Sequence, residues 1–277
     1  MLIWSVYFYI YYMRKQIIPE TEINTIQNLL KTKTRKEVSK IYNTSKSAID
    51  RYIKKYNIHT EGRSRLNESK LKFDINYFDE IDEKKAYWLG FISADGCLKN
   101  NKVSLVSKDR EMIEKFQYDL HSEHKLSIVT IFDKRTKKEY TSYKISITNN
   151  FFTKKVEKYI NNDKSNNFIL PKIDEKYYSF FIAGMFDGDG SISYYGKNKN
   201  LIRCNLISTK ECLIEIQSII EKIGVKKTEL YQYKNSKNLW KMHLYSEAYY
   251  FLKYIYDENF SEIYLSRKFN KFKNYEK

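Results

Sequence analysis

Two short segments of the chain share one pattern, and this repetition restricts the possible fold more than any other feature of the sequence. Residues 88–96 read Trp-Leu-Gly-Phe-Ile-Ser-Ala-Asp-Gly, and residues 182–190 read Ile-Ala-Gly-Met-Phe-Asp-Gly-Asp-Gly. Each segment ends an apolar stretch with the character of a helix, and similar elements follow each of them along the chain. We therefore expect two similar modules, at residues 77–172 and 173–277.

The residues after each segment predict the same order of secondary structure. A hairpin and an amphipathic helix are expected first, because the apolar residues of the helix recur at helical spacing. A second hairpin, with alternating polar and apolar residues, is expected at 127–148 and again at 229–246, and a closing helix near 151–160 and near 247–256. The predicted fold class is α+β, with two pseudo-symmetric αββαββα modules and antiparallel sheets.

Small residues recur at intervals of four within both segments. Gly90 and Ala94 share one face of the first predicted helix, and Gly184 and Gly188 share one face of the second. Such faces permit close approach of two helix backbones, so we expect the modules to pack through these motif helices.

This packing would bring two carboxylates together. Asp95 and Asp189 each end their helix, so they are expected side by side at the base of the interface. Adjacent carboxylates repel unless a cation neutralises them, and Mg²⁺ prefers such oxygen ligands. The alternative is that each Asp-Gly pair only ends a helix and starts a turn. The Asp-Gly pair occurs at equivalent places in two modules of a basic protein, which favours a metal site. A metal ion next to a phosphodiester indicates hydrolysis of that bond.

The duplicated motif, with a helix before it and a hairpin after it, resembles the LAGLIDADG homing endonucleases in their two-motif, single-chain form. The resemblance covers residues 77–277 and implies a DNA endonuclease that works as a monomer. It also implies that Asp95 and Asp189 bind the metal, and that Ala94 and Gly188 supply backbone carbonyl groups to the same site.

The resemblance further implies a lysine near each active centre. Lys164 and Lys268 stand in segments similar to those that carry it, although a solvated surface lysine is the alternative for each in so basic a chain. The first motif departs from the family pattern, with Trp88 where Leu is more usual and Ser93 where an acidic residue is more usual. Neither residue is an expected metal ligand, so the predicted site is unaffected.

The charge balance favours nucleic acid as the partner. The chain contains 50 Lys and Arg against 34 Asp and Glu, a formal net charge of +16. This excess is typical of proteins that bind DNA or RNA, although a merely basic surface would also give it. We expect the polar faces of the strands to form a saddle on the major groove of double-stranded DNA. The candidates for base or phosphate contact there are Lys144, Ser146, Arg203, Asn205, Lys241 and His243.

The residues before the modules predict a small helical domain. Thr34 and Glu37 have the spacing of a capping box, and the helix that they start is expected to bury Val38 and Ile41. A second helix is expected after Ser45.

These two helices, within residues 34–60, resemble a helix-turn-helix, although two amphipathic helices with a polar turn also occur in other small helical domains. In the second helix Lys46 and Arg51 would face a major groove. Residues 61–76 are expected to be a linker.

Residues 1–33 are interpreted as an apolar leader followed by a helix. The apolar start, residues 1–13, is shorter than the roughly 20 residues that span a bilayer and lacks the features of a signal peptide. We interpret it as a hydrophobic leader or a mis-assigned start before Met13, with a short membrane anchor as the alternative; no stable membrane partner is expected.

Other classes of protein fit less well. The three cysteines have no paired spacing, which argues against a zinc ribbon or a secreted disulfide scaffold and favours an intracellular protein. The four histidines form no zinc-ligand cluster, and no P-loop occurs. Two alternatives stay open, an RNA maturase that assists splicing of an intron RNA and a non-catalytic DNA-binding regulator. Asp95 and Asp189 favour the endonuclease, because a scaffold would need only the small residues at the helix crossing.

Overall fold

The computed structural model divides the chain into two compact units, residues 1–71 and residues 72–277, and each is described by itself. The structure describes residues 18–58, 72–133, 137–161, 163–164, 166–234, 236–256 and 263–276. The predicted leader at residues 1–13 and most of the predicted linker lie outside the described residues.

The described part of the first unit is helical. Its elements are Glu20–Glu22 (η1, a 3-10 helix), Ile23–Thr32 (α2), Arg35–Ile41 (α3) and Lys46–Lys55 (α4). The predicted capping box is present, because the Thr34 hydroxyl accepts the Glu37 N–H while the Glu37 carboxylate accepts the Thr34 N–H. The Ser45 hydroxyl caps α4 by accepting the Ala48 N–H. Helix starts here therefore follow directly from local sequence.

Apolar side chains from these helices form one small core. Val38 and Ile49 are fully buried in it. The prediction that Ile41 would be buried was wrong, because Ile41 is 53% exposed. Tyr42, four residues after Val38 and thus on the same helix face, packs against the core instead.

The first module of the second unit follows the predicted order of elements. It consists of Glu83–Asp95 (α5), Gly96–Lys99 (β1), Lys102–Ser107 (β2), Arg110–Asp119 (α6), Ser127–Asp133 (β3), Lys138–Thr148 (β4) and Asn150–Glu157 (α7). Its antiparallel sheet has the order β1-β2-β4-β3. Leu105 pairs with Ile145 and Val103 with Ile147, and all four are buried, so this face of the sheet belongs to the core.

The second module repeats this order and adds a helix. It consists of Glu175–Tyr177 (η4), Tyr178–Asp189 (α8), Ser191–Tyr195 (β5), Leu201–Thr209 (β6), Lys210–Glu221 (α9), Leu230–Gln232 (β7), Leu239–Leu244 (β8), Ala248–Ile255 (α10) and Ser266–Glu276 (α11). Its antiparallel sheet has the matching order β5-β6-β8-β7. Helix α11 was not predicted from the sequence, whose pattern indicated that the module ends with α10.

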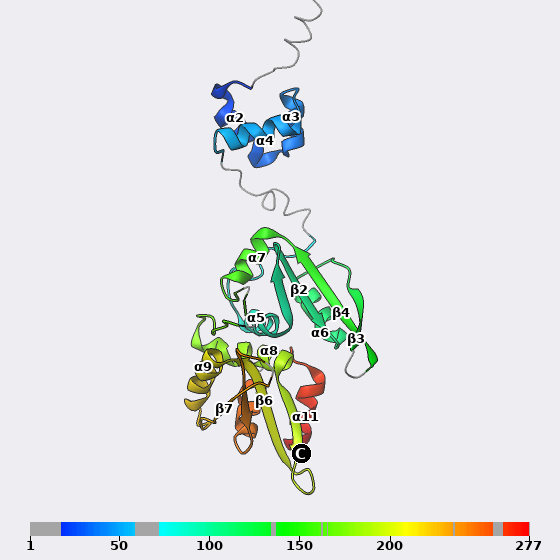
Figure 1. Ribbon diagram of the computed structural model, residues 1–277, viewed down its shortest axis with the longest axis vertical. Coiled ribbons are helices and arrows are strands. Elements are labelled where there is room, and N and C mark those ends of the chain that lie inside the picture. Colours follow the sequence, from blue (N-terminus) through cyan, green and yellow to red (C-terminus); the bar gives the residue numbers. More distant parts are fainter. Residues whose placement is uncertain are drawn as a thin grey trace, which may run out of the picture. The chain divides into compact units, whose positions relative to one another are not determined.

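Helices α5 and α8 lie side by side where the two modules meet (Figure 1). Residues 86–93 of α5 and residues 181–187 of α8 are buried without interruption. A helix that is buried all round belongs in an interior, which explains why neither has a polar face. The predicted fold class is confirmed, with two similar modules joined through their motif helices. Within the described ranges, no helix is both long enough and apolar enough to cross a membrane.

Candidate metal and DNA-binding site

Glycines make the crossing of α5 and α8 unusually close. A Cβ atom at Gly90 would lie 1.9 Å from the Phe181 carbonyl oxygen, and one at Gly184 would lie 2.0 Å from the Tyr87 carbonyl oxygen. Both distances are far below van der Waals contact, so each position requires glycine. Further along, a Cβ atom at Gly188 would lie 2.3 Å from that of Ala94, so these two small residues also face each other. The motif residues therefore set the distance between the modules.

This crossing brings the ends of the two motif helices together. Asp95 and Asp189 are the last residues of α5 and α8, and strands β1 and β5 begin directly afterwards or one residue later. A Cβ atom at Gly188 would lie 3.5 Å from the Asp95 carboxyl carbon, so the two acidic ends are adjacent. Both aspartates are exposed, and solvent, ions and ligands can reach them.

The protein around this pair disfavours its negative charge. Loss of hydration and the neighbouring Asp189 together raise the pKa of Asp95 to about 6, against the lowering effect of Lys268 and Lys164. The pKa of Asp189 is also raised, again through loss of hydration. Such a pair attracts a cation that restores the ionised state of both groups.

A lysine lies behind the end of each motif helix. Lys164 donates hydrogen bonds to the carbonyl oxygens of three residues of α5, Ile92 at 3.0 Å, Ser93 at 2.8 Å and Ala94 at 2.7 Å. Burial lowers the pKa of its ammonium group to about 8. The lysine thus binds carbonyl groups of the last turn of the helix, of which the Ile92 carbonyl oxygen also accepts the Gly96 N–H.

Lys268, from α11, occupies the corresponding place in the second module. It donates to the Phe186 carbonyl oxygen at 2.6 Å and to the Asp187 carbonyl oxygen at 2.8 Å. The residue is 3% exposed, and burial lowers its pKa to about 8. The two lysines therefore reach the same part of their motif helices from different elements, one from the segment after α7 and one from α11.

Asp187 is a functional candidate that the sequence analysis missed. It is 1% exposed, and its carboxylate accepts the Leu265 N–H at 2.8 Å, the Tyr87 hydroxyl at 2.6 Å and the Tyr256 hydroxyl. These donors come from α5, from the end of α10 and from the residue before α11. The signal was present in the sequence, because an acidic residue interrupts an otherwise apolar helix. Ser93 stands at the matching place of the first motif and donates only to the Gly90 carbonyl oxygen, at 2.6 Å.

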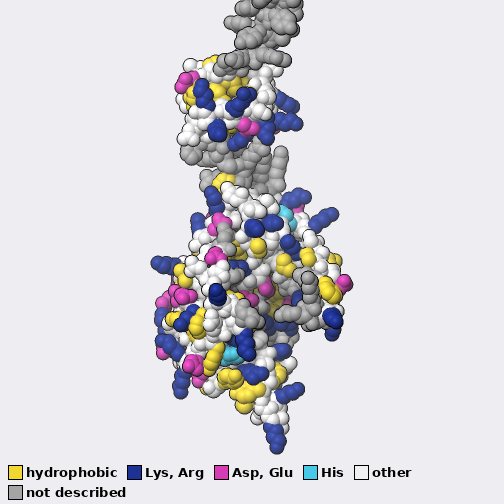
Figure 2. Space-filling model, viewed as in Figure 1, with side chains coloured by type: hydrophobic (Ala, Val, Ile, Leu, Met, Phe, Trp, Pro, Cys, Tyr) yellow, Lys and Arg dark blue, Asp and Glu magenta, His cyan; other side chains and the backbone are white. Residues whose placement is uncertain are grey.

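The predicted DNA-contacting residues of the modules lie on the faces of the sheets that point away from the core. Lys144 and Ser146 lie on β4, where the Ser146 and Ser104 hydroxyls are 2.9 Å apart. On the second sheet Asn205 of β6 pairs with His243 of β8, and Lys241 lies two residues from His243. Lys241 and His243 also line a hollow of about 700 Å³ beside β7 and β8. Figure 2 shows Lys and Arg side chains spread over the visible surface of both units.

The remaining predicted contacts belong to the first unit. Lys46 and Arg51 are exposed on α4, whereas Ile49 and Tyr52 of the same helix are buried. They belong to residues 1–71, whereas the sheet residues belong to residues 72–277.

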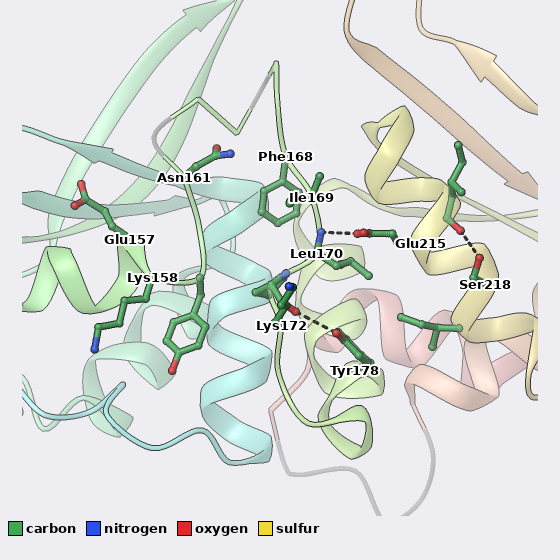
Figure 3. A pocket seen from close by; sticks show the side chains of 14 residues that line it. Glu157, Lys158, Asn161, Phe168, Ile169, Leu170, Lys172, Tyr178, Glu215 and Ser218 are labelled. Carbon is green, nitrogen blue, oxygen red and sulfur yellow. Dashed lines mark hydrogen bonds between the residues drawn. The ribbon is translucent and has the colours of Figure 1, made fainter.

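Another hollow, of about 640 Å³, lies between the end of α7, residues 168–172 and α9 (Figure 3). The Glu215 carboxylate accepts the Leu170 N–H at 2.8 Å beside it, and the Tyr178 hydroxyl donates to the Pro171 carbonyl oxygen at 3.2 Å. Its described lining contains none of the predicted site residues. It is therefore separate from the aspartate pair.

Comparison with known proteins agrees with the duplicated motif and the fold. A family model described as "LAGLIDADG-like domain" matches residues 82–161 and 176–258, together more than half of the chain. The protein therefore belongs to the LAGLIDADG family, with two copies of its domain in one chain. A search of curated proteins found no match.

Solved structures with a similar fold include homing endonucleases bound to DNA. One is the homing endonuclease I-WcaI bound to its DNA recognition sequence, with 14% identity, a TM-score of 0.51 and coverage of 79% of this chain and 97% of that chain. Another is the LAGLIDADG meganuclease I-AabMI bound to uncleaved DNA, with 10% identity, a TM-score of 0.43 and coverage of 70% and 89%. At these identities the likeness is one of fold.

Proposed function

We propose that the protein is a site-specific homing endonuclease that cuts both strands of a long, asymmetric DNA site. The observation that carries the proposal is the adjacent pair Asp95 and Asp189 at the glycine-lined crossing, between two sheets with polar outer faces. Membership of the LAGLIDADG family and the DNA-bound relatives of similar fold support it. Because the two modules differ in sequence, the two halves of the site should differ as well.

Mg²⁺ is the cofactor that fits this pair of residues best. Among the described residues, no group of three or more His, Cys, Asp or Glu could hold a metal ion by itself. Two carboxylates, with the carbonyl oxygens of Ala94 and Gly188 as further candidates, leave places that water and phosphate oxygens would fill, as Mg²⁺ prefers. When bound, the ion supplies Lewis-acid activation of water and stabilisation of the leaving 3′ oxygen.

The side chains around this pair have distinct proposed roles. Asp95 and Asp189 bind the cofactor, and Lys164 and Lys268 fix the ends of the motif helices while placing positive charge near the phosphate. The outer sheet faces bind the duplex through Lys144, Ser146, Arg203, Asn205, Lys241 and His243.

The first unit would extend the DNA footprint. We propose that α3 and α4 act as a helix-turn-helix, in which Lys46 and Arg51 contact the duplex. One copy of the chain contains both modules, so a monomer suffices, and an intracellular, DNA-associated location follows from this role.

The test is a Mg²⁺-dependent cleavage selection on a randomised or genomic DNA library. We expect the unmutated protein to cut one defined site, and Asp95→Asn or Asp189→Asn to lower cleavage by about a hundredfold or more, because each loses a charged ligand. Asp79→Asn is the matched control, since Asp79 is a surface carboxylate paired with Lys155 and should not affect cleavage. Tight binding without cutting by any form would contradict the endonuclease and favour the regulator or the RNA maturase.

A further inference from the structure

Two side chains on the outer face of the second sheet are held in place by serines of the neighbouring strand. The β5–β6 register sets Ser191 opposite Asn205 and Ser193 opposite Arg203. The Asn205 side-chain amide donates to the Ser191 hydroxyl at 2.6 Å, and Arg203 Nε donates to the Ser193 hydroxyl at 2.9 Å. The Arg203 guanidinium carbon also lies 5.8 Å from the centre of the Tyr195 ring. Each long polar side chain is thus restrained before any ligand binds.

These hydrogen bonds leave the base-reading groups of both residues available. Arg203 uses Nε for Ser193, which leaves its two terminal NH₂ groups as a planar fork. Asn205 uses one amide N–H for Ser191, which leaves its carbonyl oxygen and the second N–H. The first arrangement matches O6 and N7 of guanine in the major groove, and the second matches N6 and N7 of adenine.

The fold orders these two residues relative to the aspartate pair. Ser191 follows Asp189 by only two residues, so its partner Asn205 lies on the side of the sheet near the helix ends. Arg203 lies two residues further along β6 on the same face, a step of about 7 Å. Since base pairs are about 3.4 Å apart, the two side chains would address positions one or two base pairs apart.

The first module lacks an equivalent pair. At the matching positions Cys97 is opposite Ser104 and Lys99 is opposite Lys102. The Ser104 hydroxyl pairs with Ser146, and lysine is a compact point charge without a planar fork. The two modules therefore present different chemistry at equivalent distances from the aspartates.

We propose that Arg203 and Asn205 read a guanine and an adenine in the half-site bound by the second module, with the adenine nearer the cleavage centre. The proposal rests on the proposed function, because it requires duplex DNA on this sheet. It adds that the DNA positions nearest the cleavage centre are more strictly specified in the half-site of the second module than in that of the first module. The first module contacts its equivalent positions with small hydroxyl groups and lysines.

The experiment is a selection of bound sequences from a randomised duplex library in buffer without divalent metal, followed by a cleavage assay with Mg²⁺ on the selected DNA. The full chain is compared with Arg203→Lys, Asn205→Ser and Ser193→Ala. Arg203→Lys should lower the preference for guanine about tenfold at one position and leave the others unchanged. Asn205→Ser introduces the residue found at the matching position of the first module, Ser104. It should lower the preference for adenine at one position about tenfold and leave the others unchanged. Ser193→Ala should give a smaller loss at the guanine, because Arg203 stays but loses its restraint.

Lys102→Ala is the matched control from the first module, and it should weaken binding to all sequences without changing the selected motif. Thermal unfolding of each variant confirms that it is folded. If Arg203→Lys selects the same DNA motif as the unmutated chain, the proposed recognition of guanine by Arg203 is wrong, whether or not the DNA is cut. If the variants select different DNA motifs but no form cuts the DNA, the result supports base recognition by Arg203 and Asn205 and contradicts the proposed endonuclease activity. If no form enriches any sequence, both proposals are wrong.

Discussion

At the scale of single residues, the most consequential difference between the two motifs is the residue two positions before the motif aspartate. The Asp187 side chain accepts hydrogen bonds from three donors that lie far apart in the chain, whereas the Ser93 side chain donates to the Gly90 carbonyl oxygen of its own helix. A buried carboxylate is costly unless its oxygens are satisfied, and these donors satisfy them. Asp187 therefore has a stabilising role that its counterpart does not share.

Replacing this carboxylate should destabilise the second unit strongly. Asp187→Ala leaves two hydroxyl groups and one backbone N–H without their acceptor, and we expect the free energy of unfolding to fall by about 3 kcal/mol. Urea denaturation followed by circular dichroism measures this change. The matched control is Ser93→Ala, which removes a single hydrogen bond and should cost about 1 kcal/mol. Equal losses for the two variants would show that the Asp187 contacts contribute little.

At the scale of secondary structure elements, the sequence was informative where the determining contacts are local or periodic. Alternation predicted the strands, and in β8 the buried Met242 and Leu244 alternate with the more exposed Lys241 and His243. Small residues every four positions predicted the helix crossing. Both signals can be read within a short window of sequence.

Helix α11 could not be predicted in this way, because distant residues position it. The Ser266 hydroxyl donates to the Glu111 carboxylate at 3.1 Å and Arg267 Nε donates to the Asp109 carboxylate at 3.1 Å, so its start is tied to the first module. The Leu265 N–H before it bonds to Asp187. These contacts join residues more than 70 positions apart in the chain, and no local pattern encodes them. The placement of Lys268 depends on them as well.

The crossing of α5 and α8 gives the prediction that belongs to this scale. In Gly184→Ala the new methyl group would meet the Tyr87 carbonyl oxygen at 2.0 Å, so the helices must move apart. We expect a loss of about 3 kcal/mol or more in the free energy of unfolding, since overpacking of a rigid backbone contact cannot be relieved by a side-chain rotation. Chemical denaturation provides the measurement.

Ala94→Gly tests the same interface in the opposite direction. It removes a methyl group and should cost only about 1 kcal/mol, mainly through the lower helix propensity of glycine. If Gly184→Ala were as stable as the unmutated protein, the close backbone contact would not exist in solution.

At the scale of the whole molecule, the chain joins a two-module unit with the aspartate pair to a separate basic helical unit. The first unit has its own core around Ile26, Val38 and Ile49, whereas Asp95 and Asp189 both belong to the second unit. Affinity and chemistry should therefore be separable. Lys46 and Arg51 are exposed on α4, whereas Ile49 and Tyr52 are buried, so this helix keeps basic side chains available for the duplex.

This separation predicts how a double substitution in the full chain behaves. With Lys46→Ala and Arg51→Ala together, the affinity for the selected DNA should fall several-fold and the salt dependence of binding should weaken by about two charges. Cleavage at saturating protein should remain unchanged, because the aspartate pair belongs to the other unit. Binding isotherms at several salt concentrations and single-turnover cleavage measure the two effects. The control is Lys222→Ala with Lys227→Ala, which removes two exposed lysines that are paired with Glu175 and Glu221 and are not among the predicted DNA contacts. An equal loss of affinity for both double variants would indicate a general charge effect, and a loss of saturated cleavage with Lys46→Ala and Arg51→Ala would contradict the division between the units.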